Sequence, residues 1–125
     1  MTAPNIRSPG NIIGKTYVGS IGGTNHDTPG TLINNSNSDK VYKINAIIVS
    51  SIGSLDAEVS IDVIDADADT RSYLAKKIDV PPRSAQVIST KKTYFYLEEN
   101  FRIRAARTGG TINTASITIS YEIIS

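Results

Sequence analysis

The chain has 125 residues, no cysteine and a formal net charge of +1. This length fits one domain with a core of its own, and without cysteine that domain cannot be a disulfide scaffold. Because basic and acidic residues nearly balance, no global field attracts nucleic acid or an anionic membrane, and we expect neither as a partner.

The first ten residues predict an extended arm, followed by one domain over residues 11–125. Pro4 and Pro9 favour extended backbone in the residues before them and cannot donate ladder hydrogen bonds. Ile6 offers an apolar anchor and Arg7 a charged one, so both are candidate contacts with a partner. The arm lacks a basic region followed by an apolar run, so we expect no signal peptide and no membrane span.

The rest of the chain keeps returning to a two-residue period of apolar and polar side chains, which is typical of strands with one buried face. Clusters of turn-forming residues separate these segments. Strands are predicted at about 11–20, 31–34, 41–50, 58–64, 70–80, 84–90, 93–97, 101–106 and 115–124. Short strands at nearly regular spacing, with no helical stripe, predict an all-β fold, a single antiparallel β-sandwich of the jelly-roll kind.

The same alternation predicts which side chains form the core. In the segment 58–64, the apolar residues should point inward, whereas Ser60 and Asp62 should point outward. The predicted core is Ile44, Ala46, Ile48, Val59, Ile61, Val63, Ile103, Ile117, Ile119 and Tyr121.

Three carboxylates on alternate residues, Asp65, Asp67 and Asp69, are similar to the opening of a calcium-binding loop. An EF-hand would need glycine at the position of Thr70 and glutamate at that of Lys76. We therefore interpret the segment as an acidic hairpin tip, and weak cation binding there stays open.

No combination of residues predicts a catalytic site. His26, the only histidine, lies beside Asp27 but has no identifiable nucleophile as a partner. Glu98 and Glu99 are adjacent, and adjacent side chains in a strand point apart, whereas glycosidase carboxyls face each other. We expect a protein that is not an enzyme, with no catalytic residue, metal, cofactor or small-molecule substrate.

A basic cluster lies towards the carboxyl end. Arg102 and Arg104 fall on one strand face, near Lys91 and Lys92, and aromatic residues are close in sequence. A groove for single-stranded nucleic acid is one interpretation of such a pattern, but Glu98 and Glu99 interrupt it. Cross-strand pairing or a subunit contact is the preferred interpretation, so Arg102 and Arg104 are candidate partner contacts.

Several stretches together resemble a family of small structural proteins of tailed bacteriophages, notably marine ones. They are Lys-Val-Tyr-Lys-Ile-Asn-Ala-Ile-Ile-Val at 40–49, the acid-flanked strand at 59–63, Ile-Asp-Val-Pro at 78–81, Tyr-Leu-Glu-Glu-Asn-Phe-Arg-Ile-Arg-Ala at 96–105 and the closing Ser-Tyr-Glu-Ile-Ile. The resemblance covers residues 41–125 and transfers no binding residue. It implies a non-enzymatic particle protein in many copies, made in the host cytoplasm and located in the virion.

We therefore expect a capsid decoration, or cement, protein that stabilises the head lattice as a trimer. Its partners would be copies of itself and the major capsid protein or another virion protein. Two alternatives stay open. One is a protein of the neck, tail or fibre, and the other is a carbohydrate-binding module. Tyr17, Tyr73, Tyr94 and Tyr96 would supply stacking in such a module, although it would lack tryptophan, the usual sugar platform.

Overall fold

The computed structural model describes residues 8–21, 32–51, 57–109 and 115–125, and of residues 107–109 it describes the backbone alone. The described elements are β1 (Ile12–Ile21), β2 (Leu32–Ile33), β3 (Val41–Ser51), β4 (Ala57–Asp65), β5 (Thr70–Val80), β6 (Ser84–Ser89), the 3-10 turn η1 (Lys91–Thr93), β7 (Phe95–Leu97), β8 (Phe101–Gly109) and β9 (Ala115–Ile124). Every strand expected from the sequence is present. The all-β antiparallel sandwich is therefore confirmed.

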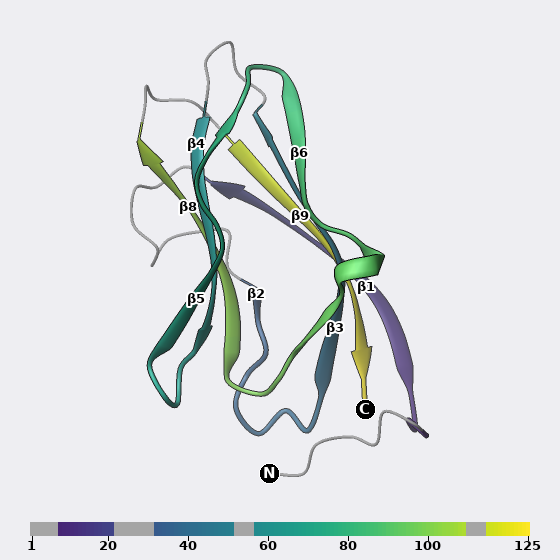
Figure 1. The fold of residues 1–125 in the computed structure, drawn as a ribbon. Helices are drawn as coiled ribbons and strands as arrows, with labels where there is room; N and C mark the ends of the chain where they lie inside the picture. Colours follow the sequence, from purple (N-terminus) through teal and green to yellow (C-terminus); the bar gives the residue numbers. More distant parts are fainter. Residues whose placement is uncertain (1–7, 22–31, 52–56, 110–114) are drawn as a thin grey trace.

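Two sheets face each other across the core (Figure 1). One has the strand order β1-β9-β3-β6, with the short β7 also paired to β3, and the other has the order β2-β8-β4-β5. The antiparallel pairs β1 with β9, β2 with β8, β3 with β6 and β4 with β5 are nested inside one another. This nesting amounts to one long hairpin, with its tip between β4 and β5, rolled into two layers. It is the jelly-roll arrangement that the sequence predicts.

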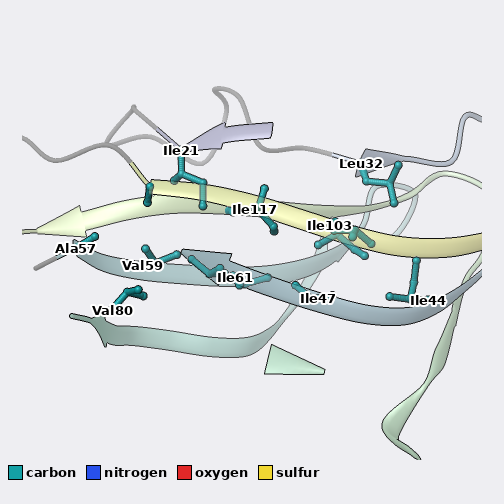
Figure 2. Close-up of a cluster of buried hydrophobic side chains, with 14 of the residues drawn as sticks. Ile21, Leu32, Ile44, Ile47, Ala57, Val59, Ile61, Val80, Ile103 and Ile117 are labelled. Carbon is teal, nitrogen blue, oxygen red and sulfur yellow. The ribbon is translucent and has the colours of Figure 1, made fainter. Parts of the chain in front are cut away.

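Aliphatic side chains from both sheets fill the space between the layers (Figure 2). Ile47 of β3, Ile61 of β4 and Ile103 of β8 are wholly buried there. Of the predicted core, Ile44, Val59, Ile61, Ile103, Ile117 and Ile119 are confirmed as fully buried, and Val63 and Tyr121 are partly buried against the cluster. β-Branched residues dominate this core because they pack well on a pleated surface.

The prediction for the middle of β3 is wrong by one residue. A bulge interrupts the pairing of β3 with β9 between Ile44 and Ala46, and an extra residue there reverses the alternation. Ile47 and Val49 consequently face the core with no exposed surface. Ala46 is only partly buried, and Ile48 lies on the outer surface with 37% of its area exposed.

Ser60 and Asp62 of β4 lie opposite the inward residues, as expected, but they are not exposed. Both are buried, at 1% and 0% relative exposure, because neighbouring strands cover this face of the sheet. The backbone N–H of Lys77 donates a hydrogen bond to the Ser60 hydroxyl at 2.9 Å. Side chains from β5 and β8 cover Asp62, as described below.

Asn34, at the end of β2, ties two loops together. Its side-chain amide donates to the carbonyl oxygens of Lys40, at 2.9 Å, and Leu97, at 3.0 Å, and its Oδ1 accepts from Ser38. Asn34 has no exposed surface. The segment after β2 is therefore anchored to the connection between β7 and β8.

The carboxyl end pairs with the start of β1. The backbone N–H groups of Gly10 and Asn11 both donate to the carbonyl oxygen of Ser125, at 2.8 and 3.1 Å. Residues 1–7, with Ile6 and Arg7, lie outside the described residues. Among the residues that are described, no helix has the length and apolar character needed to cross a membrane.

Candidate functional site

The outer surface of the five-stranded sheet carries a patch that we call the uncharged face. Cross-strand register places its residues in rows, because partners across a sheet point to the same side. The members are Thr16, Val18 and Ser20 of β1, Ser116, Thr118 and Ser120 of β9, Ala46, Ile48 and Ser50 of β3, and Ala85 and Val87 of β6. All are small hydroxyl or aliphatic residues, and none is charged.

The central row of this face runs through Val18, Thr118, Ile48 and Val87. Val18 and Val87 are 71% and 60% exposed, the highest values among the large hydrophobic side chains of the described residues. In the next row, the hydroxyls of Ser50 and Ser116 are hydrogen-bonded to each other at 2.7 Å. Their polar groups are thus partly satisfied within the sheet, which lowers the cost of removing this face from water.

The rim of the face, at the end nearer the start of β3, is a row that contains charged and aromatic residues. Register aligns Gly14 of β1, Glu122 of β9, Lys43 of β3 and Tyr96 of β7. The Lys43 ammonium lies 4.6 Å from the ring centre of Tyr94, and the Tyr94 and Tyr96 rings meet edge to face at 5.8 Å. The only charges in this row are therefore one acid and one base on the two central strands.

The outer surface of the four-stranded sheet is built around a buried carboxylate. Asp62 of β4 accepts two hydrogen bonds from Arg104 of β8, both at 3.1 Å, and lies 3.1 Å from Nε of Arg71 on β5. The side chain of Asp62 is wholly buried and that of Arg104 is 9% exposed. Both ions are thereby compensated within the chain.

Arg102 and Arg104 differ in what they offer to a partner. Arg104 is buried and pairs with Asp62 of the neighbouring strand, which is the cross-strand pairing expected from the sequence as one of two alternatives. The positive charge of Arg104 compensates the carboxylate of Asp62, which is buried on the neighbouring strand β4. Arg102 is only partly buried, and its Nε is enclosed without a hydrogen-bond partner. Partner contacts by Arg102 and Arg104, and by Ile6 and Arg7 of the arm, stay predictions.

The carboxylates at the tip between β4 and β5 shape the turn. Asp65 Oδ1 accepts hydrogen bonds from the backbone N–H groups of Asp67 and Ala68, and Asp67 accepts one from the Asn100 side chain. No group of three His, Cys, Asp or Glu residues among those described converges on a point where a metal ion could sit. These contacts favour the hairpin-tip interpretation of this segment.

The other residues singled out in the sequence are not brought together. Glu98 is exposed, whereas Glu99 is buried and accepts a hydrogen bond from the backbone N–H of Asp39, so the two carboxylates point apart as expected. His26 lies outside the described residues. Among the four tyrosines considered for sugar stacking, only Tyr94 and Tyr96 are neighbours, because Tyr73 lies on β5 of the other sheet and Tyr17 packs against the core.

Comparisons with protein-family models and with curated proteins give no match for this sequence. Among solved structures, the N-terminal endo-1,4-β-D-xylanase 10B of Clostridium thermocellum is similar, in a structure that holds its CBM22-1 and GH10 modules complexed with xylohexaose. The similarity covers 91% of this chain and 26% of that chain, at 14% identity and a TM-score of 0.37. A likeness this distant carries no argument about function.

Sequence reasoning missed the uncharged face. Its signal lies in two segments, Thr16-x-Val18-x-Ser20 and Ser116-x-Thr118-x-Ser120, in which the outward positions hold no charge. The register of β1 on β9 places these segments side by side. The bulge in β3 adds Ile48, which the alternation alone assigns to the core.

Proposed function

We propose that this protein is a non-catalytic structural protein of a tailed bacteriophage particle, present in many copies and bound to the outer capsid. One observation carries the proposal, the uncharged face of the sheet β1-β9-β3-β6. Charges of both signs interspersed over the surface keep a free domain soluble, whereas this face has no Lys, Arg, Glu or Asp. Exposed apolar side chains gathered in one row, here Val18, Ile48 and Val87, and bordered by polar residues are typical of a surface that another protein covers.

Two further features support an assembly role. The resemblance of residues 41–125 to phage structural proteins points to the virion, and the jelly roll is a fold used by viral capsid domains. The second of these is a fold-level analogy, since the same fold serves other functions such as lectins. In this proposal the partners are further copies of the chain and the major capsid protein. The trimer on the particle, expected from the sequence, stays a prediction.

The test is a copy count on purified particles of the phage that encodes this chain, by quantitative mass spectrometry against the major capsid protein. Hundreds of copies per particle are expected of a head-lattice protein. A few copies, or about a dozen, would place the protein at the neck, baseplate or fibre. Absence of the protein from purified particles would overturn the proposal.

A carbohydrate-binding role is the second candidate, and one observation favours it. Tyr94 is 49% exposed, its ring meets Tyr96 edge to face, and Lys43 lies beside it. An exposed aromatic ring with a nearby polar group is a common way to hold a sugar ring. Retention on an insoluble polysaccharide that is lost in Tyr94→Ala, but kept in the other-sheet control Tyr73→Ala, would favour this role.

A further inference from the structure

We propose that two copies of this chain pack their uncharged faces together, related by a twofold axis that runs parallel to the strands between β9 and β3. This inference rests on the proposed function in one respect, since it assigns the face that carries that proposal to a second copy of the chain, which leaves the contact with the capsid protein to another surface. A twofold contact buries the same patch on both copies, so the patch must be complementary to itself. The strand order and the cross-strand rows allow that condition to be checked residue by residue.

The strand order is compatible with this axis. Because β9 and β3 occupy the centre of the order β1-β9-β3-β6, a rotation about an axis between them brings β9 opposite β3 of the second copy. It also brings β1 opposite β6. A rotation about an axis parallel to the strands keeps each residue at its own height along the strand, so every row meets the same row in reverse order. The two sheets then pack in the aligned manner of β-sandwiches.

The apolar row is complementary to itself under this rotation. Val18 comes opposite Val87 of the second copy, and Ile48 opposite Thr118, with the reciprocal contacts made at the same time. The two most exposed large hydrophobic side chains of the described residues are thereby covered by each other. The adjacent row of serines and Ala85 has short side chains, which let the sheets approach closely.

The rim row supplies both charge and shape complementarity. Lys43 comes opposite Glu122 of the second copy, and Glu122 opposite Lys43, so two pairs of opposite charge form. Gly14 comes opposite Tyr96, and the outward position of a Cβ on Gly14 has no atom within 4 Å. That open space can receive the aromatic ring. An axis perpendicular to the strands would instead set the charged row against the serine row, so the charges select the parallel axis.

The size of the face sets the expected strength of the contact. Four strands about 4.8 Å apart, and the rise from the Gly14 row to the Ser20 row, give a patch of about 20 Å by 20 Å, or roughly 400 Å² on each copy. A standard-size interface uses about 800 Å² per partner. The dimer should therefore be weak in dilute solution. The fraction of dimeric chains should rise with the local concentration, which is high when many copies crowd on one particle.

Cross-linking of introduced cysteines tests the axis directly, because the native chain has no cysteine. Val18→Cys and Val87→Cys are made as separate variants, mixed, and treated with a bis-maleimide whose reach matches the spacing of packed sheets, about 10 Å. The expected product is a dimer that joins residue 18 of one copy to residue 87 of the other. Each variant alone should cross-link weakly, because the axis holds identical residues of the edge strands three strand spacings, about 14 Å, apart along the face, in addition to the distance between the two sheets. Leu74→Cys, on the other sheet, is the matched control and should not join Val18→Cys.

Charge exchange tests the rim in the cysteine-free protein by sedimentation. Lys43→Glu and Glu122→Lys, each alone, should lower self-association at least tenfold, because like charges then face each other across the axis. Mixing the two variants should restore association, since each charge now meets its opposite. Val18→Lys should abolish association and leave the melting temperature of the monomer within a few degrees.

The results separate this inference from the proposed function. No cross-link between 18 and 87, preferential linkage of 18 to 18, or a monomer at the highest concentrations would overturn the twofold packing. So would loss of capsid binding in Val18→Lys with no change in self-association, which would assign the face to the capsid protein. Dimerisation of a chain that is absent from purified particles would overturn the virion role and leave the interface standing.

Discussion

Asn34 shows how one buried amide fixes two loops. Its Nδ2 group donates to the carbonyl oxygens of Lys40 and Leu97, in a part-buried and a buried hydrogen bond. We expect Asn34→Ala to lower the free energy of unfolding by about 2 to 4 kcal/mol, because the buried carbonyl of Leu97 and the part-buried carbonyl of Lys40 both lose their donor. Asn34→Asp should cost more, since an oxygen would then face them. Urea denaturation measures both, and the exposed Asn35→Ala should be near neutral.

Asp62 depends in the same way on its cationic neighbours. Arg104→Met should destabilise the fold by about 3 to 5 kcal/mol, because it removes the buried cation that donates two hydrogen bonds to the Asp62 carboxylate. Replacing both ions, as Asp62→Leu with Arg104→Met, should recover much of that loss. Equal stability of the single and double variants in urea would contradict this account of the pair.

In strand β3, the bulge decides which of two adjacent isoleucines is buried and therefore contributes to the free energy of unfolding. Ile47→Ala should cost about 2 to 5 kcal/mol because Ile47 is wholly buried, whereas Ile48→Ala should cost less than about 1 kcal/mol in the monomer. The two adjacent substitutions remove the same number of atoms, so each controls for the other. Equal losses by thermal or urea unfolding would show that the bulge lies elsewhere.

The strands could be predicted because their periodicity is local, whereas the pairing of most strands was not predicted, because it joins segments that are distant in sequence. Ala46-Ile-Ile-Val49 is apolar on both sides, so its sequence fits either phase, and the extra residue at the bulge is invisible in it. The burial of Asp62 could not be predicted either, because its buried partner Arg104 lies on β8, 42 residues away in the sequence. The uncharged face could not be predicted for the same reason, because its residues come together only through the register between strands.

The stability of the whole molecule at high pH depends on Tyr42 and Tyr121, whose ring centres lie 5.2 Å apart. Burial raises the pKa of both phenols above the usual value of about 10, with a further rise for Tyr121 from the proximity of Tyr42. A raised pKa means that the folded state favours the neutral phenols. Their contribution to the free energy of unfolding is therefore present below pH 10 and is lost as the pH rises through the pKa of the folded state. Tyr42→Phe with Tyr121→Phe should flatten the fall of the melting temperature above pH 10, and an unchanged slope would contradict this origin.

The outer surfaces of the two sheets differ in chemistry. The four-stranded sheet carries the ion pairs of Asp62, whereas the centre of the five-stranded sheet holds no charged residue. Of the arm expected over residues 1–10, residues 1–7 lie outside the described residues, and Ile6 and Arg7 stay candidate contacts with a neighbour on the particle. Ten extended residues span at most about 33 to 36 Å, enough to reach an adjacent subunit.

Deleting residues 2–8 tests that arm. Gly10 and Asn11, which bond to Ser125, are kept in the truncated chain, so the melting temperature of the free domain should stay nearly unchanged. Self-association through the uncharged face should also persist, because none of its residues is removed. Incorporation into particles should fall, since a fastening to the neighbour is lost. Normal incorporation of the truncated protein, measured in competition with the full chain, would rule out the arm as a fastening.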